Sequence, residues 1–214
     1  INKYIALLYS VIPKFLLRVF FEKLIKPKFS IETKYTQVPI TFDLWYNQAI
    51  GGHCSSVYWP VHKSSLVLSP ENIYCGIETS PGYMPGNYIQ GFGKIYIGDY
   101  TQIGPNVGII SSNHSLEDNR KSIKLAVHIG KYSWLGFGCC VLPGVKLGPY
   151  TIVGAGSIVT KSFPKGYCVI AGNPAKIVKK LNPKECISHE SEFKYNGYIK
   201  SSIFEDFRNK YLNI

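Results

Sequence analysis

The sequence predicts a mainly β protein, a parallel β-helix flanked by an N-terminal helical segment and a C-terminal helical tail. Three features of residues 129–159 predict this fold. Glycine, small residues and aliphatic residues each recur there with the same spacing. The aliphatic residues form a ladder of rungs at every sixth position: Ile129, Leu135, Val141, Leu147, Val153 and Val159. Small or β-branched residues stand two positions before the rungs: Ser133, Cys139, Val145, Thr151 and Ser157.

A six-residue period fits neither a helix nor a hairpin, but it is the period of a hexapeptide solenoid. Two inward side chains that are two residues apart indicate a short strand with one buried face. Glycine follows the rungs at positions 130, 136, 148 and 154. We expect these glycines to turn the corners between strands, often with positive φ. Three strands and three corners then make one coil, and the rungs of successive coils pack on each other.

Residues 1–34 form the predicted N-terminal amphipathic segment. Tyr4–Ile25 is strongly apolar but contains four charged residues, whereas a spanning helix needs about 20 mostly uncharged ones. We therefore expect no transmembrane helix. We also expect no signal peptide, because no small-residue cleavage site follows a short apolar core. Pro13 is expected to break the helix or to start its second part. The helix either packs on its own protein or lies on a membrane surface with its basic residues toward the headgroups. Its polar stripe is Lys3, Ser10, Lys14, Arg18 and Glu22.

Residues 35–60 are predicted to be an irregular, aromatic connecting segment. Val38–Phe42 is a candidate strand. The aromatic side chains that follow could stack on sugar rings, but packing inside the protein is the more common role of such residues. They are Trp45, Tyr46, Tyr58 and Trp59, with His53 and His62 nearby.

Residues 61–170 are the predicted β-helix domain. Its ladder begins weakly at Val61, Val67 and Ile73, is interrupted by a loop at Pro81–Gly86, and resumes at Ile97, Ile103 and Ile109. Twenty residues then separate Ile109 from Ile129, where a perfect ladder would use eighteen. Residues 111–124 between them are polar, so we predict a protruding loop, the kind of segment that carries binding and catalytic groups on a rigid scaffold.

Residues 171–214 form the predicted tail. Pro164, Gly166 and Pro174 end the solenoid. Short helices are expected at Lys176–Leu181 and at Ile203–Tyr211.

The composition limits the function classes. A net charge of +11 predicts a surface that attracts anions. No nucleic-acid-binding motif is present, so a phosphate-rich cofactor or an anionic membrane accounts for the charge better than nucleic acid does. The six cysteines form no CxxC pair, which favours reduced, buried or half-buried thiols in a cytosolic protein.

The run IGKYSWLGFGCCVLPGVKLGPYTIVGAGSIVTK, followed by AGNPAK at 171–176, resembles the left-handed β-helix acyltransferases. More narrowly, it is similar to the acetyl-CoA-dependent sugar and xenobiotic O-acetyltransferases. The resemblance extends from near Ile95 to Lys176 and implies the left hand of the solenoid. It also implies acetyl-CoA as co-substrate, no metal, and a homotrimer of parallel prisms with CoA in the clefts between them.

Transfer of an acetyl group to a hydroxyl needs a general base near neutral pKa, for which histidine is the usual choice. His114 lies in the predicted loop, and the resemblance implies that it is this base. Asn113 is a candidate for positioning the substrate or stabilising the oxyanion. Glu117 or Asp118 could orient the imidazole as in a catalytic triad, or both could be solvated loop acids.

His128 directly precedes the rung Ile129, and the resemblance implies that a histidine at this position is a second candidate for the substrate site. The resemblance also implies that Trp134 lies beside the cofactor or substrate, or it is an outward aromatic in a subunit contact. Gly136 and Ala155 would let pantetheine approach the strands closely, and the resemblance implies that four further residues lie near the CoA nucleotide: Thr160, Lys161, Pro174 and Lys176. Lys179 and Lys180 are expected to be ordinary surface charges.

The predicted function is therefore an acetyl-CoA-dependent O-acetyltransferase acting on a sugar. The amphipathic N-terminal segment favours surface-polysaccharide biosynthesis, in the cytoplasm or at the inner face of the cytoplasmic membrane. An N-acetyltransferase of a nucleotide-linked amino sugar and an antibiotic acetyltransferase remain as alternatives. A γ-class carbonic anhydrase needs three histidines on zinc, and His114 and His128 have no close third partner.

Overall fold

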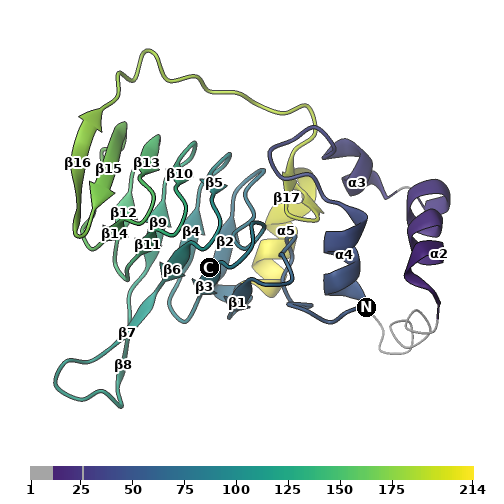
Figure 1. Ribbon diagram of the computed structural model, residues 1–214, viewed down its shortest axis with the longest axis horizontal. Helices are drawn as coiled ribbons and strands as arrows, with labels where there is room; N and C mark the ends of the chain where they lie inside the picture. The colour runs from purple at the N-terminus through teal and green to yellow at the C-terminus, as the bar shows by residue number, and fades with distance from the viewer. Residues whose placement is uncertain (1–11, 26) are drawn as a thin grey trace.

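The computed structural model describes residues 12–25 and 27–214. Short strands stack along the long axis of the molecule, and helices cover one end of the stack (Figure 1). Three parallel sheets form its three sides. Sheet A contains β1 (Leu66–Leu68), β3 (Tyr88–Gln90), β6 (Gly108–Ile110), β11 (Cys140–Val141) and β14 (Ile158–Val159). Sheet B contains β2 (Ile73–Cys75), β4 (Ile95–Ile97), β9 (Val127–Ile129) and β12 (Lys146–Leu147). Sheet C contains β5 (Gln102–Ile103), β10 (Trp134–Leu135), β13 (Thr151–Val153), β15 (Cys168–Gly172) and the antiparallel β16 (Ala175–Lys180).

In the regular coils from β9 to β14, consecutive strands lie in different sheets, in the order B, C, A, while hydrogen-bonded neighbours come from successive coils. Leu135 pairs with Val153, and Val141 pairs with Val159. All four side chains are buried, as are the small residues two positions earlier, for example Thr151 and Ser157. The six-residue ladder therefore lies in the core of the protein, as the sequence predicts. Its side chains are buried, and its rungs pair with the rungs of neighbouring coils.

The glycines after the rungs have a different role from the predicted one. Gly130 and Gly136 do not adopt positive φ. They are needed because the next coil approaches closely: a Cβ at Gly130 would lie 2.4 Å from the backbone of Gly148 and Pro149. Positive φ falls three residues after the rung instead, for example at Gly138 (64°). At the edge between sheets B and C it is adopted by a column of tyrosines: Tyr100, Tyr132, Tyr150 and Tyr167.

The first coils and the register break also differ from the prediction. Cys75, not Ile73, aligns with the rung Ile97, and Ile89 supplies a rung that the interrupted ladder did not include. Ile109 and Ile129 lie on adjacent sides of the prism, in sheets A and B. A regular coil would join them in six residues rather than twenty, so the insertion is fourteen residues long and projects from the prism.

The N-terminal segment is helical, with α2 (Lys14–Val19), the π-helical turn η1 (Phe20–Ile25) and α3 (Lys28–Glu32). Pro13 directly precedes α2, as expected of a proline that starts a helix. The predicted strand at Val38–Phe42 is wrong: α4 (Phe42–Ala49) begins there, capped by the Thr41 hydroxyl, which accepts from the amide of Leu44. Sequence-based expectations for residues 1–11 lie outside the described residues.

The aromatic segment that follows α4 packs, as expected. Trp59 is fully buried and its indole donates to the carbonyl of Pro81 over 2.7 Å. Tyr58 is also buried and contacts Phe204 of the C-terminal helix. These contacts close the first coil against solvent.

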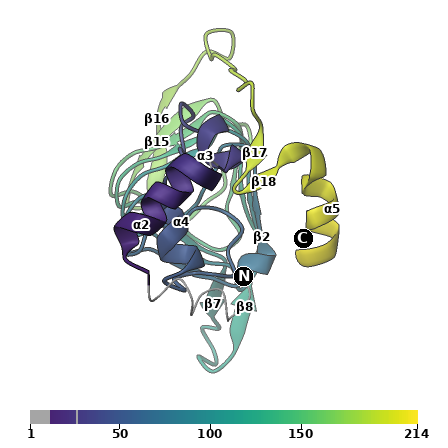
Figure 2. The ribbon, with the colours of Figure 1, turned by 90° about the vertical axis from the view of Figure 1, so that its right-hand side faces the viewer.

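The tail after β15 turns back on itself. The predicted helix at Lys176–Leu181 is wrong, because these residues form the strand β16, paired antiparallel with β15. The chain then runs back along the prism to the hairpin of β17 (Tyr195–Asn196) and β18 (Ile199–Lys200), followed by α5 (Ser201–Tyr211) (Figures 1 and 2). The helix predicted at Ile203–Tyr211 is confirmed. In the described ranges, no helix has the length and apolarity to cross a membrane.

Candidate functional site

A hairpin projects from the prism and carries His114. It consists of β7 (Ser112–His114) and β8 (Ser122–Lys124), and it leaves sheet A after β6 (Figure 1). Its base is fixed by the amide of Leu125, which donates to the carbonyl of Ser111 over 2.9 Å. His114 is exposed on the hairpin, opposite Ser122, and Asn113 is exposed beside it. The predicted loop is therefore an ordered arm that presents an imidazole to solvent.

Both candidate orienting acids are engaged at the tip of this hairpin. Glu117 accepts a 2.8 Å hydrogen bond from the Ser115 hydroxyl, which lowers the pKa of the carboxyl. Asp118 pairs with Arg120 at 2.8 Å, and this guanidinium lowers the pKa of Asp118. In the described part of one chain, neither acid hydrogen-bonds His114, so both behave as loop-stabilising acids here.

His128 lies on the outer face of sheet B. Its ring stacks on Tyr96, with centroids 4.7 Å apart and planes within 8°. Partial burial lowers the pKa of His128, and the neighbouring Lys146 lowers it further. A shallow pocket beside it is also lined by Tyr74 and Arg208. His128 thus belongs to a different side of the prism from the candidate cofactor residue Trp134.

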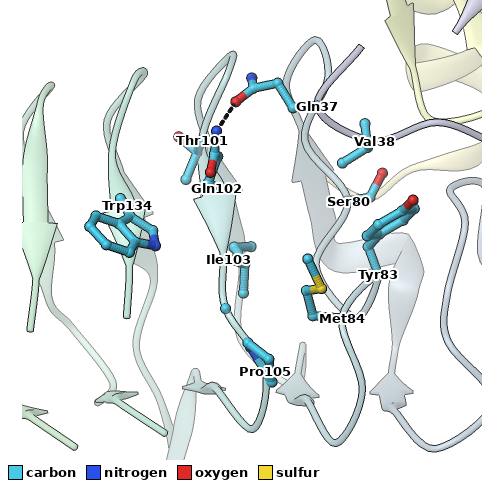
Figure 3. A pocket seen from close by; sticks show the side chains of 11 residues that line it. Gln37, Val38, Ser80, Tyr83, Met84, Thr101, Gln102, Ile103, Pro105 and Trp134 are labelled. Atoms are coloured by element: carbon cyan, nitrogen blue, oxygen red, sulfur yellow. Dashed lines mark hydrogen bonds between the residues drawn. The ribbon is translucent and has the colours of Figure 1, made fainter. Parts of the chain in front are cut away.

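Trp134 stands on the outer face of sheet C, where its side chain is 53% exposed. It borders a pocket of about 220 Å³ that lies over the first two coils (Figure 3). The apolar part of the wall includes Met84, Ile103 and Pro105. Along the described residues that line it, there is no Asp, Glu, Lys, Arg or His.

Two polar groups of this pocket have no hydrogen-bond partner among the described residues. They are the buried hydroxyl of Ser80 and the side-chain nitrogen of Gln37. The oxygen of Gln37 is held by the amide of Gln102, which donates to it over 2.5 Å (Figure 3). Each unpaired buried polar group costs about 1–3 kcal/mol, and neither of the two atoms is exposed to solvent. Sequence reasoning missed this pocket because Gln37 reaches sheet C only through the tertiary fold.

The candidate cofactor residues follow two edges of the prism. Gly136, Ala155 and Pro174 lie along the edge between sheets C and A. A Cβ at Gly136 would come within 2.6 Å of the carbonyl of Val153, so the coils meet closely along this edge. The amide of Gly172, at the turn before Pro174, donates to the Ser157 hydroxyl over 3.0 Å.

Thr160 and Lys161 follow β14 on the edge between sheets A and B, the edge from which the His114 hairpin also leaves. Lys176 is exposed on β16, beside Ala171. Lys179 and Lys180 are exposed farther along the same strand. The candidate residues are therefore distributed over the two edges and the outer faces of the prism: the hairpin with His114 leaves the edge between sheets A and B, whereas Trp134 and the pocket beside it belong to sheet C.

No group of three or more His, Cys, Asp or Glu side chains that could hold a metal ion occurs within residues 12–25 and 27–214. The six cysteines are free thiols. Burial raises the pKa of Cys139 to about 12, so this thiol stays protonated at neutral pH.

Comparison with known proteins agrees with this architecture. Residues 126–161 match the family described as bacterial transferase hexapeptide (six repeats). A galactoside O-acetyltransferase of Lactococcus lactis is 35% identical over 117 residues, 53% of this chain and 53% of the relative. The chain spans about half the length of the curated relatives that it matches.

Two solved structures have the same architecture. A maltose O-acetyltransferase from Clostridium difficile 630 superposes with a TM-score of 0.50 and 28% identity, over 57% of this chain and 66% of that one. A galactoside acetyltransferase in complex with coenzyme A gives 0.52 and 26%, over 64% and 68%. The chain thus carries the hexapeptide repeat and resembles the hexapeptide acyltransferase superfamily, in particular its sugar O-acetyltransferases.

Proposed function

We propose that this chain is an acetyl-CoA-dependent O-acetyltransferase acting on a sugar hydroxyl, built on a left-handed β-helix. The observation that carries the proposal is the exposed His114 on a hairpin of a hexapeptide solenoid similar to galactoside and maltose O-acetyltransferases. A histidine with access to solvent can take the proton of an attacking hydroxyl near neutral pH. A polysaccharide-related acceptor and a place at the inner face of the cytoplasmic membrane belong to the same proposal.

The edges of the prism fit coenzyme A. A narrow pantetheine chain needs close access to the strands, and Ala155, which is exposed on the edge between sheets C and A, has only a methyl side chain. The phosphates need cations, and Lys161, after β14, and Lys176, on β16, are both exposed near the end of the prism. When bound, acetyl-CoA would supply an activated thioester. The chain itself would hold the phosphates and orient the acyl group.

The pocket beside Trp134 fits the acceptor. The apolar wall of Met84 and Ile103 suits the face of a sugar ring. The exposed polar side chain of Gln102, in the same lining, suits its hydroxyls. A wall without charged residues favours a neutral sugar over the charged acceptor of the alternative N-acetyltransferase reaction.

The pocket contains no histidine, so the base must come from elsewhere. We propose a homotrimer in which His114 of one chain reaches the pocket of the next. Trp134 and Phe137, which are 53% and 57% exposed on one side of the prism, would be covered by such an assembly. Asn113 and Glu117 would then be available to position substrate or the imidazole across the same contact.

The test measures thiol release from acetyl-CoA with neutral sugars, amino sugars, nucleotide sugars and antibiotics as acceptors. Acetylation of a neutral sugar, with an ester in the product, supports the proposal. We expect His114→Ala to lower kcat by about 10²–10⁴-fold, the usual contribution of a general base, with little effect on CoA binding. His128→Ala should cost less. Exclusive amide formation on amino sugars, or full activity of the His114 variant, would overturn the proposal.

A further inference from the structure

The outermost helical element of the molecule has an apolar face that no other described residue covers. Five large apolar side chains of α2 and η1 are 41–72% exposed: Phe15, Leu16, Val19, Phe20 and Leu24. These residues define the patch called here the outer face. Soluble proteins expose single apolar residues freely, but a contiguous group of this size on one short element indicates an interaction site.

The outer face is distinct from the face that holds the helix in place. Leu17 and Phe21 are buried, 5% and 2% exposed, and pack against Phe42 of α4. The ring of Phe21 also lies 4.9 Å from that of Trp45. The helix is therefore anchored by one stripe, while a second apolar stripe stays exposed. The helix itself lies at the end of the molecule, beside α4 (Figures 1 and 2).

Charge indicates what would cover the outer face. Residues 12–34 contain six Lys or Arg residues and two Glu. Lys14 and Arg18 are paired with Asp43 and Glu22. Lys23 is exposed on η1 among the apolar side chains, Lys28 is exposed at the start of α3, and Lys34 is exposed in the turn after it. Apolar side chains surrounded by cations fit a surface that is apolar inside and anionic at its boundary.

We propose that the outer face docks on an anionic lipid membrane, with the aromatic and aliphatic side chains in the interfacial zone and the lysines at the headgroups. The element is too short to span the bilayer, and it lies at the end of the prism, so the whole molecule can approach a flat surface end-on (Figure 1). Each cation near an anionic surface adds to the attraction, and each buried apolar side chain adds to the affinity. The proposal does not depend on the acetyl-transfer activity.

The experiment measures flotation of the full chain with vesicles of phosphatidylcholine, with and without phosphatidylglycerol. We expect binding to the anionic vesicles at low salt, weakened by added salt. The variant Phe15→Ser/Phe20→Ser/Leu24→Ser should bind about tenfold or more weakly, because it removes most of the insertable apolar surface. The matched control Val178→Ser/Ile187→Ser/Ile203→Ser removes equally exposed apolar side chains elsewhere and should bind like the wild type.

A photoactivatable lipid gives a second measurement on the wild-type chain, independent of whether the variants fold. Crosslinks that map to residues 14–24 support the proposal. Crosslinks that map only elsewhere, no binding to anionic vesicles, or equal binding of both triple variants would overturn it. Loss of oligomer mass in the outer-face variant without any vesicle binding by the wild type would assign the face to a second copy of the chain instead.

Discussion

Four tyrosines hold a backbone conformation that residues with a side chain rarely adopt. Tyr100, Tyr132, Tyr150 and Tyr167 have φ between 47° and 57°, and their rings stack at 5.0–5.2 Å. Such backbone strain costs of order 1–3 kcal/mol for each residue. The stacked rings and their hydrogen bonds offset part of this cost, since the hydroxyl of Tyr132 donates to the carbonyl of His189 over 2.7 Å. The column thus joins the coils to the returning tail.

The glycines after the rungs make a prediction at the same scale. Gly130→Ala should destabilise the protein by about 2 kcal/mol or more, because overpacking costs about 1–3 kcal/mol and the new Cβ would meet rigid backbone at 2.4 Å. Denaturant unfolding measures this. Gly138→Ala is the control: nothing lies within 4 Å, and only the strain of φ at 64° remains. A larger loss at position 138 than at 130 would contradict the close-approach explanation.

The lowered pKa of His128 predicts a pH dependence of stability. Because burial and Lys146 depress this pKa below 6.5 in the folded state, the unfolded state binds the proton more tightly. The stability that neutral His128 contributes to the folded protein is therefore fully present above the pKa of the unfolded state. It is lost as the pH falls through the pKa of the folded state. The wild type should lose Tm between about pH 7 and pH 5 relative to His128→Gln. Parallel Tm profiles of the two proteins would refute this.

Among the elements, the β15–β16 hairpin and the β7–β8 hairpin place the functional candidates. The first ends sheet C and carries Pro174 and Lys176. The second inserts fourteen residues into one coil and carries His114. Neither hairpin disturbs the register of the scaffold. The strands before and after the β7–β8 insertion still pair with those of neighbouring coils, and β15 pairs with β13 in the ordinary parallel register.

Two exposed lysines, Lys161 after β14 and Lys176 on β16, predict a cofactor effect. Lys161→Ala and Lys176→Ala should each raise the KM for acetyl-CoA, by up to about tenfold, since a hydrogen bond to a charged group is worth about 1.5–3 kcal/mol and less when exposed. Steady-state kinetics measures this, with Lys180→Ala as the control from the same strand. A lysine that binds the 3′-phosphate should lose its effect with dephospho-acetyl-CoA. Unchanged KM in both variants would remove them from the cofactor site.

At the scale of the whole molecule, the tail closes the end at which the solenoid begins. Phe204 of α5 is 4% exposed and lies against Tyr58 and Tyr74. Asn196 is buried, and its amide donates to the carbonyl of Cys75 in the first full coil over 2.9 Å. Without this cover, the rungs of the first coil would face water.

This cap can be tested on one helix. Phe204→Ala should lower the free energy of unfolding by about 3–5 kcal/mol, the usual cost of removing a buried aromatic ring. Ile203→Ala changes the neighbouring side chain, which is 58% exposed, and should cost less than about 0.5 kcal/mol. Equal losses would show that α5 contributes through helix propensity rather than through packing.

The sequence by itself determined the repeating part of the protein. Each rung from Ile129 to Val159 meets an equivalent rung, so one local pattern, repeated, specifies both the strand and its neighbour. The projecting segment with His114 was also predictable, because a polar insertion interrupts that pattern. The N-terminal helix followed from its own amphipathic spacing, and a helix was also expected where α5 lies.

Only the tertiary structure decided the rest. Two short segments were assigned wrongly, Val38–Phe42 and Lys176–Leu181, because short segments take the conformation that their surroundings impose. In the first, the Thr41 cap starts a helix at Phe42. In the second, pairing with β15 makes a strand. The pocket beside Trp134 was not predictable, since Gln37 and Ser80 are far from Trp134 in sequence and meet it only when the coils stack. The outer face likewise depends on which stripe of α2 packs on α4, and spacing along one helix cannot distinguish two apolar stripes.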